Sequence, residues 1–185
     1  MITWRAIALG IVVIFGSQSS NGQQRVPQNV VESLSKMFGD TISVSRRTVI
    51  LLSEEQATVF ERSKTRWATD TVDVYICSTT NGVRGYGFVD DVKGKTQLIT
   101  YLVGILPGGT VQDVDVLAYR EAYGGEITHA SFRKQFQNKT VQDKLQPGKD
   151  IKNISGATIS VRAITYGVKR ILATFALITP RLQQR

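Results

Sequence analysis

The sequence predicts an α+β fold, in which an antiparallel β-sheet of about four to six strands packs with helices and a long C-terminal helix. Three observations predict it. Apolar residues recur at helical spacing near the beginning of the chain. The middle holds several runs rich in β-branched and aromatic residues, separated by turns that contain glycine. A second stretch of helical spacing follows, and helices on either side of a run of strands are typical of α+β proteins.

The first helix is expected over residues 26–38, because its apolar residues share one helical face. These residues are Val30, Val31, Leu34, Met37 and Phe38. The next run, 42–52, predicts a strand or a pair of strands. Ser53 and Gln56 have the spacing of a capping box, so a second helix is expected to begin there and to reach about Trp67.

Four strands are expected in the middle of the chain. They cover residues 71–80, 83–92, 96–105 and 111–121. The apolar alternation of the last strand breaks near Gln112, which indicates a β-bulge. A short helix is expected over residues 128–138, and a long one from Gly156 to about Thr174.

Composition excludes several functions. The 23 lysines and arginines exceed the 15 acidic residues, for a net charge of +8, but they are scattered and no nucleic-acid-binding module accompanies them. No nucleic-acid partner is therefore expected. Cys77 is the single cysteine, so no internal disulfide can form. His129 is the single histidine, which excludes a Ser–His–Asp triad within one molecule and a multi-histidine zinc site.

The N-terminus has the layout of a secretory signal: Arg5, an apolar run, and then small and polar residues. Residues 1–22 are expected to be a signal peptide or an N-terminal membrane anchor, and the protein to be exported. Residues 23–70 form a predicted helical and strand subregion, followed by a main domain over residues 71–180.

The tetrapeptide Ser155–Thr158 opens the last predicted helix. Ser155 is a candidate N-cap, and the free amides of a helix N-terminus attract phosphate groups. Gly156 and Ala157 carry almost no side chain, so a bulky phosphorylated ligand could approach the backbone, with the Thr158 hydroxyl beside it. A plain helix cap and a phosphate site remain alternatives on this spacing alone.

Residues 154–160, "ISGATIS", resemble the flavinylation motif of the FMN-binding domain family. The segments "GYGFVDDVKGK", "VLAYREAYGGEI" and "FRKQFQNK" are also similar to that family, in the expected order, over roughly residues 72–173. The family includes exported flavin subunits of Rnf-type complexes and of sodium-pumping NADH:quinone reductases. The resemblance implies that Thr158 carries FMN through a phosphoester, which a separate flavin transferase attaches.

The same resemblance implies further cofactor-binding residues. They are Ser155, Gly156, Ala157 and Ser160 of the motif, and Glu121, Tyr123 and Gly124 of the preceding segment. Tyr119 and Tyr123 are each expected either to stack on the flavin ring or to pack against the strand. Lys152 departs from the pattern, because the family carries an acidic residue there; Asp150 lies two residues further from the motif.

The predicted function is that of an exported electron-transfer protein with covalent FMN, at the periplasmic or extracytoplasmic face of a membrane. Its predicted partners are the flavin transferase and redox proteins at or near that membrane. No catalytic residue and no metal site are expected, and the protein is interpreted as an electron carrier or complex subunit rather than a stand-alone enzyme. The alternative is an exported module without redox function that binds a phosphorylated ligand non-covalently.

Overall fold

The computed structural model describes residues 26–40 and 42–183, so the predicted signal peptide or anchor at 1–22 lies outside the described residues. The α+β prediction is confirmed. The elements, in chain order, are α1 (Gln28–Phe38), β1 (Ser43–Ile50), α2 (Ser53–Ser63), β2 (Thr71–Thr79), β3 (Gly82–Lys93), β4 (Leu98–Ile105), β5 (Val111–Ala118), η1 (Gly125–Thr128), α3 (Ala130–Arg133), η2 (Lys134–Phe136) and α4 (Thr158–Gln183). Within the described ranges, no helix combines the length and the apolar character that a membrane crossing requires.

The five strands form one sheet in the order β1-β2-β3-β4-β5, and every neighbouring pair is antiparallel. The bulge predicted near Gln112 is present. Gly104 pairs with Asp113 and Ile105 with Val111, which leaves Gln112 as the extra residue of β5. The run 42–52 forms the single edge strand β1, so of the two readings of that run the single strand is correct.

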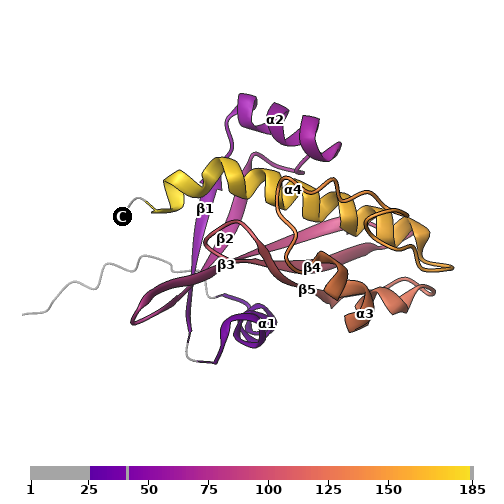
Figure 1. Cartoon of the computed structure of the whole chain (residues 1–185), viewed down its shortest axis with the longest axis horizontal. Helices are drawn as coiled ribbons and strands as arrows, with labels where there is room; N and C mark the ends of the chain where they lie inside the picture. Colours follow the sequence, from indigo (N-terminus) through magenta and orange to yellow (C-terminus); the bar gives the residue numbers. More distant parts are fainter. Residues whose placement is uncertain (1–25, 41, 184–185) are drawn as a thin grey trace, which may run out of the picture.

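Helices cover both faces of the sheet (Figure 1). The long α4 lies along one face, and α2 packs against the outer side of α4. The shorter α1 packs on the opposite face, against β3, β4 and β5. The start of α4 lies at the same end of the molecule as α3 (Figure 1).

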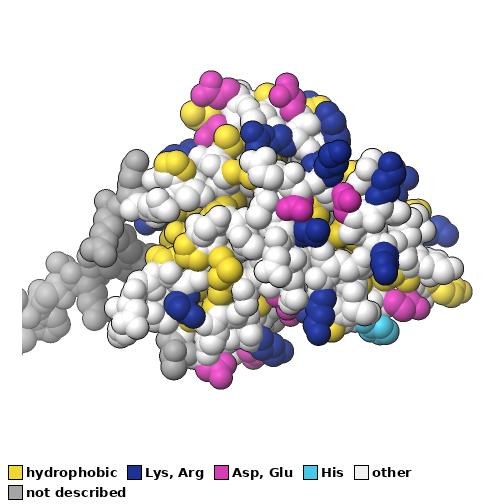
Figure 2. Space-filling view, viewed as in Figure 1, with side chains coloured by type: hydrophobic (Ala, Val, Ile, Leu, Met, Phe, Trp, Pro, Cys, Tyr) yellow, Lys and Arg dark blue, Asp and Glu magenta, His cyan; other side chains and the backbone are white. Residues whose placement is uncertain are grey.

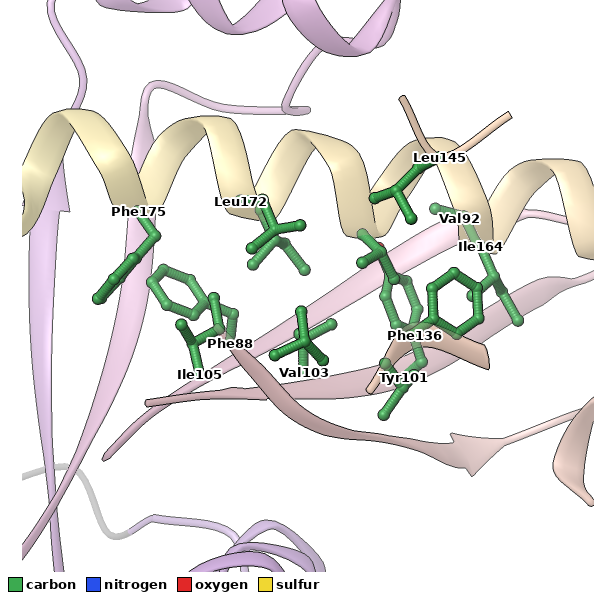
Figure 3. Close-up of a cluster of buried hydrophobic side chains, with 14 of the residues drawn as sticks. Phe88, Val92, Tyr101, Val103, Ile105, Phe136, Leu145, Ile164, Leu172 and Phe175 are labelled. Atoms are coloured by element: carbon green, nitrogen blue, oxygen red, sulfur yellow. The ribbon is translucent and has the colours of Figure 1, made fainter. Parts of the chain in front are cut away.

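The main core lies between α4 and the sheet. Figure 3 shows Leu172 and Phe175 of α4 pointing toward Phe88 and Val103 of the strands, and all four side chains are buried. Full burial of an aliphatic or aromatic side chain contributes about 1.5–3 kcal/mol, so this layer dominates the stabilisation of α4 on the sheet.

Several helix boundaries differ from those expected. The final helix begins at Thr158 rather than Gly156 and continues to Gln183, because its apolar face stays buried as far as Leu182. The second helix ends at Ser63 rather than Trp67, where Lys64 takes a left-handed conformation with φ 61°. The predicted capping box of Ser53 and Gln56 does not cap the first turn of this helix. The Glu55 carboxylate accepts from the Leu52 amide at 2.8 Å instead.

Candidate functional site

The start of α4 is the first feature of the site. Gly156 has a left-handed φ of 79°, and the resulting turn lets the Ala157 amide donate to the Ile154 carbonyl at 3.0 Å. The Ala157 carbonyl accepts the amide of Val161 at 2.9 Å, which makes Ala157 the residue that caps the helix. The expectation that Ser155 is the N-cap is therefore wrong, because the turn at Gly156 places it two residues too early.

The amides of the first turn are free. Thr158, Ile159 and Ser160 donate to no backbone acceptor among the described residues, as is usual for the first turn of a helix. Such donors, with the positive end of the helix dipole, favour an anion. The Thr158 side chain is exposed at this point, and Ile159 is half exposed.

A pocket of about 590 Å³ lies in front of the helix start. Its described lining residues are Lys95, Thr96, Glu121, Ala122, Tyr123, Gly156, Ala157, Thr158, Ile159 and Ser160. Three segments far apart in the sequence thus meet there: the turn between β3 and β4, the chain after β5, and the first turn of α4. The volume falls within the range of small-molecule and cofactor sites.

Six of the eight predicted cofactor-binding residues line this pocket: Glu121, Tyr123, Gly156, Ala157, Thr158 and Ser160. The other two lie outside its lining. Ser155 is exposed in the turn before the helix. Gly124 lies behind the wall, with a left-handed φ of 83°, and a Cβ at this position would approach the Ala157 Cβ to 2.7 Å. A glycine is therefore needed for the loop to pack against the helix start.

Glu121 fixes one wall of the pocket. Its carboxylate accepts from the Thr96 hydroxyl at 2.6 Å, the Thr96 amide at 2.7 Å and the Gln97 amide at 3.0 Å. These hydrogen bonds, led by the one from the Thr96 side chain, lower the pKa of Glu121 to about 2. The carboxylate is therefore ionised at neutral pH and joins the chain after β5 to the β3–β4 turn.

The two tyrosines of the loop have different environments. The Tyr119 hydroxyl donates to the Tyr123 carbonyl and lies 3.4 Å from the Ser160 Oγ, so it connects the loop to α4. Tyr119 does not line the pocket. Tyr123 does, and its side chain is 83% exposed. Of these two rings, Tyr123 is the one that a ligand in the pocket can contact.

Lys152 and Asp150, which precede the motif, form hydrogen bonds away from the pocket. The Lys152 amide donates to the Gln135 Oε1 at 2.7 Å, and the Asp150 carboxylate accepts from the Gln146 amide at 2.9 Å. Neither residue lines the pocket. The Asp150 carboxylate is therefore hydrogen-bonded within its own turn rather than at the pocket.

Four lining residues were not among those predicted from the sequence: Lys95, Thr96, Ala122 and Ile159. Ala122 and Ile159 adjoin predicted residues and could have been included by proximity. Lys95 and Thr96 belong to a turn more than sixty positions before Thr158. Gly94 is one of the turn glycines that separate the predicted strands, but no pattern in the sequence indicates that this turn lines a pocket with the start of the final helix.

Surface charge is distributed as the sequence indicates. Figure 2 shows lysine and arginine side chains spread over this face of the molecule, with acidic side chains between them and no dense block. Cys77 is buried, and burial raises the pKa of its thiol to about 12. No group of three or more potential metal ligands is found within the described part of the chain.

The fold is an α+β domain with a pocket at the start of its long helix, and comparison with known proteins shows what this part of the chain is similar to. Residues 94–173 match the model of the family described as the FMN-binding domain. The resemblance stated from the sequence is thereby confirmed. The match covers a little under half of the chain and includes all ten lining residues of the pocket. β2 and the whole of β3 lie before its first residue.

Individual proteins are also similar to this chain, among them the following two. One is a component of the proton-translocating ferredoxin:NAD(+) oxidoreductase complex of Clostridium ljungdahlii, which is 31% identical over 115 residues, a region that is 58% of this chain and 62% of that protein. The chain therefore spans less than two thirds of that relative. The crystal structure of Shewanella oneidensis NqrC matches with a TM-score of 0.60 at 15% identity, over 83% of this chain and 98% of that one. At this identity the likeness establishes a shared fold.

The residues of the pocket fit FMN. The free amides of Thr158, Ile159 and Ser160 suit its phosphate, and Tyr123 and Ile159 offer apolar surface to its ring. Gly156 leaves room for the phosphate, because a Cβ there would meet no atom within 4 Å.

Proposed function

We propose that this protein is an exported electron-transfer flavoprotein that carries FMN through a phosphoester on the Thr158 hydroxyl. One observation carries the proposal. Thr158 is an exposed hydroxyl on the first residue of a 26-residue helix, beside three free amides and a pocket of about 590 Å³. The matched FMN-binding segment contains all of these residues.

The chain's own groups would hold the cofactor in place. The amides of the first turn of α4 would neutralise the phosphate charge, and the backbone at Gly156 and Ala157 would let the phosphate approach closely. Tyr123 and Ile159 would cover the ring, while Glu121 would keep the β3–β4 turn in position. FMN itself supplies the electron-accepting and electron-donating chemistry, and the protein orients it and adjusts its electronic environment.

The proposed partners follow from the relative and from the chemistry of attachment. The similar Clostridium ljungdahlii protein belongs to a ferredoxin:NAD(+) oxidoreductase complex, and the N-terminus of this chain has the layout of a secretory signal. We therefore place this protein beside redox proteins at the extracytoplasmic face of a membrane. Threonine hydroxyls are poor nucleophiles without an activating base, and no histidine, cysteine or lysine other than Lys95 lines the pocket in the described residues. A separate flavin transferase is therefore proposed to attach FMN.

Coexpression with a flavin transferase tests the proposal. The wild-type chain should gain the mass of FMN less one water and a visible flavin spectrum that persists after denaturation. Thr158→Ala should abolish both while the far-UV circular dichroism stays unchanged, because Thr158 is exposed and makes no side-chain hydrogen bond with a described residue.

Ser131→Ala is the matched control, since this exposed hydroxyl lies outside both the motif and the pocket lining. It should gain the same mass as the wild type. A Thr158→Ala protein that still carried FMN covalently, or a wild-type chain that gained none, would contradict the proposal.

The second candidate is an exported module without redox function that binds a phosphorylated ligand non-covalently. The specific observation in its favour is Lys152, which stands where the family has an acidic residue, with Asp150 hydrogen-bonded to Gln146. Purification from the native host distinguishes the two. A phosphorylated compound released on denaturation, with no flavin on the polypeptide, would support the second candidate.

A further inference from the structure

The wall of the pocket contains one cationic and one acidic side chain among its described residues, Lys95 and Glu121. The Glu121 carboxylate already accepts three hydrogen bonds from Thr96 and Gln97. Its charge is therefore stabilised by the protein and is committed to the β3–β4 turn.

The Lys95 side chain has no such hydrogen bonds to the described residues. The neighbouring Lys93 donates its ammonium to the Thr96 carbonyl at 3.2 Å, whereas the Lys95 ammonium makes no hydrogen bond or ion pair with any residue in the described ranges. The Lys95 side chain is exposed and lines the pocket. Because Glu121 holds the adjacent Thr96 by both its amide and its hydroxyl, the backbone of this turn is fixed relative to the pocket.

Lys95 and the phosphate site belong to different walls. Thr158 and the free amides come from the start of α4, and Lys95 comes from the turn between β3 and β4. The helix amides and dipole suffice to hold a phosphate. The charge of Lys95 is thus available to the part of the ligand that lies away from the helix.

We propose that Lys95 is an electrostatic tuning residue that raises the reduction potential of FMN held in this pocket. The proposal rests on the function proposed above. On full reduction the flavin ring takes up two electrons from a redox partner and one proton from solvent, and so gains one negative charge. A positive charge at the pocket wall stabilises that state relative to the oxidised one.

Four chains test the proposal after coexpression with the flavin transferase: wild type, Lys95→Gln, Lys95→Arg and Lys93→Gln. Lys93→Gln is the matched control, because it removes the same charge from the same turn at a residue that does not line the pocket. Intact mass first establishes the FMN content of each chain. Spectroelectrochemical titration then gives the midpoint potential at low and at high ionic strength.

Lys95→Gln should carry FMN at the wild-type level and show a lower midpoint potential, and Lys95→Arg and Lys93→Gln should remain at the wild-type value. The difference between Lys95→Gln and wild type should shrink as salt screens the charge. An unchanged potential in fully loaded Lys95→Gln, or an equal fall in Lys93→Gln, would overturn the role of Lys95 and leave the flavin function standing.

The FMN content of each chain distinguishes the remaining outcomes. A folded Lys95→Gln chain without FMN, beside a loaded wild type, would assign Lys95 to cofactor attachment and overturn the tuning role. A wild-type chain without FMN would refute the function proposed for the protein, and the tuning role with it.

Discussion

Glu121 shapes the pocket through the backbone that it holds. Its carboxylate accepts the amides of Thr96 and Gln97 and the hydroxyl of Thr96, and a Cβ on Gly94 would approach the Glu121 Oε1 to 2.4 Å. The carboxylate therefore holds the turn by hydrogen bonds, and the turn needs a glycine at position 94 to leave room for the carboxylate. Glu121 was predicted from the sequence as a cofactor-binding residue, and the structure places it in the pocket lining. Its contact with the turn depends on the pairing of β3 with β4, which a local sequence pattern does not reveal.

The pKa of Glu121 leads to a prediction about pH. Because hydrogen bonding lowers that pKa to about 2 from an ordinary value of 4.5, the anchoring of the turn is fully present above pH 4.5 and is lost as pH falls through about 2. In NMR titrations, the Thr96 and Gln97 amide resonances should move with an apparent pKa near that low value.

Two variants check the assignment. In Glu121→Gln these amide resonances should no longer titrate at low pH, and their hydrogen exchange at neutral pH should be faster. Glu126→Gln, which removes an exposed carboxylate of η1, should leave both amides as in the wild type. Titration of Thr96 and Gln97 near pH 4.5 in the wild-type protein would contradict the hydrogen-bonding pattern.

At the scale of elements, α4 approaches the sheet closely at Gly167. A Cβ at this position would lie 2.0 Å from the Tyr101 Oη and 3.0 Å from the Val92 Cγ1. The Tyr101 side chain is fully buried and donates to the Asp90 carboxylate at 2.6 Å, so it cannot move aside without losing that hydrogen bond.

Gly167→Ala is therefore expected to destabilise the protein. Alanine in a helix interior gains about 1 kcal/mol over glycine in helix propensity, but overpacking of a buried contact costs roughly 1–3 kcal/mol and should exceed it. Urea denaturation should give a lower free energy of unfolding. Gly108→Ala is the control, because a Cβ there meets nothing within 4 Å, and its effect should stay within about 0.5 kcal/mol. A Gly167→Ala protein as stable as the wild type would refute the close contact.

Sequence patterns predicted the elements better than their ends. The break in alternation at Gln112 correctly marked a bulge, because strand periodicity is a local property. The start of α4 was placed two residues early, since the left-handed turn at Gly156 is stabilised by the Ile154–Ala157 hydrogen bond rather than by a serine cap. The end of α4 was placed nine residues early, because its last turns are buried by distant parts of the chain.

At the scale of the whole molecule, Arg170 joins three parts of the fold. Its guanidinium forms an ion pair with Asp90 of β3 at 2.5 Å, donates to the Arg66 carbonyl in the connection between α2 and β2, and stacks on Trp67 at 4.7 Å. Arg170 is one of the scattered basic residues of the sequence, and nothing in its local pattern distinguishes it, but it is only 6% exposed. Long-range packing decides which charges of a helix are buried.

Arg170→Ala should cost roughly 3–5 kcal/mol of the free energy of unfolding, because it leaves the Asp90 carboxylate buried without its partner. Arg162→Ala, on an exposed position of the same helix, should change that free energy by less than about 0.5 kcal/mol. Chemical denaturation of the two variants measures the difference. Equal effects would show that the buried pair makes no special contribution.

The order of the strands also bears on how the chain folds. Each strand pairs with the strand next to it in sequence, so the sheet can assemble by adding one hairpin after another, with local contacts that favour rapid folding. The helix that covers its apolar face comes forty positions after the last strand ends. During synthesis the N-terminal part of the chain emerges first, so the sheet can form before α4 has been made. Until α4 packs on the sheet, that apolar face stays exposed, and the packing of α4 is the step that protects the chain from aggregation.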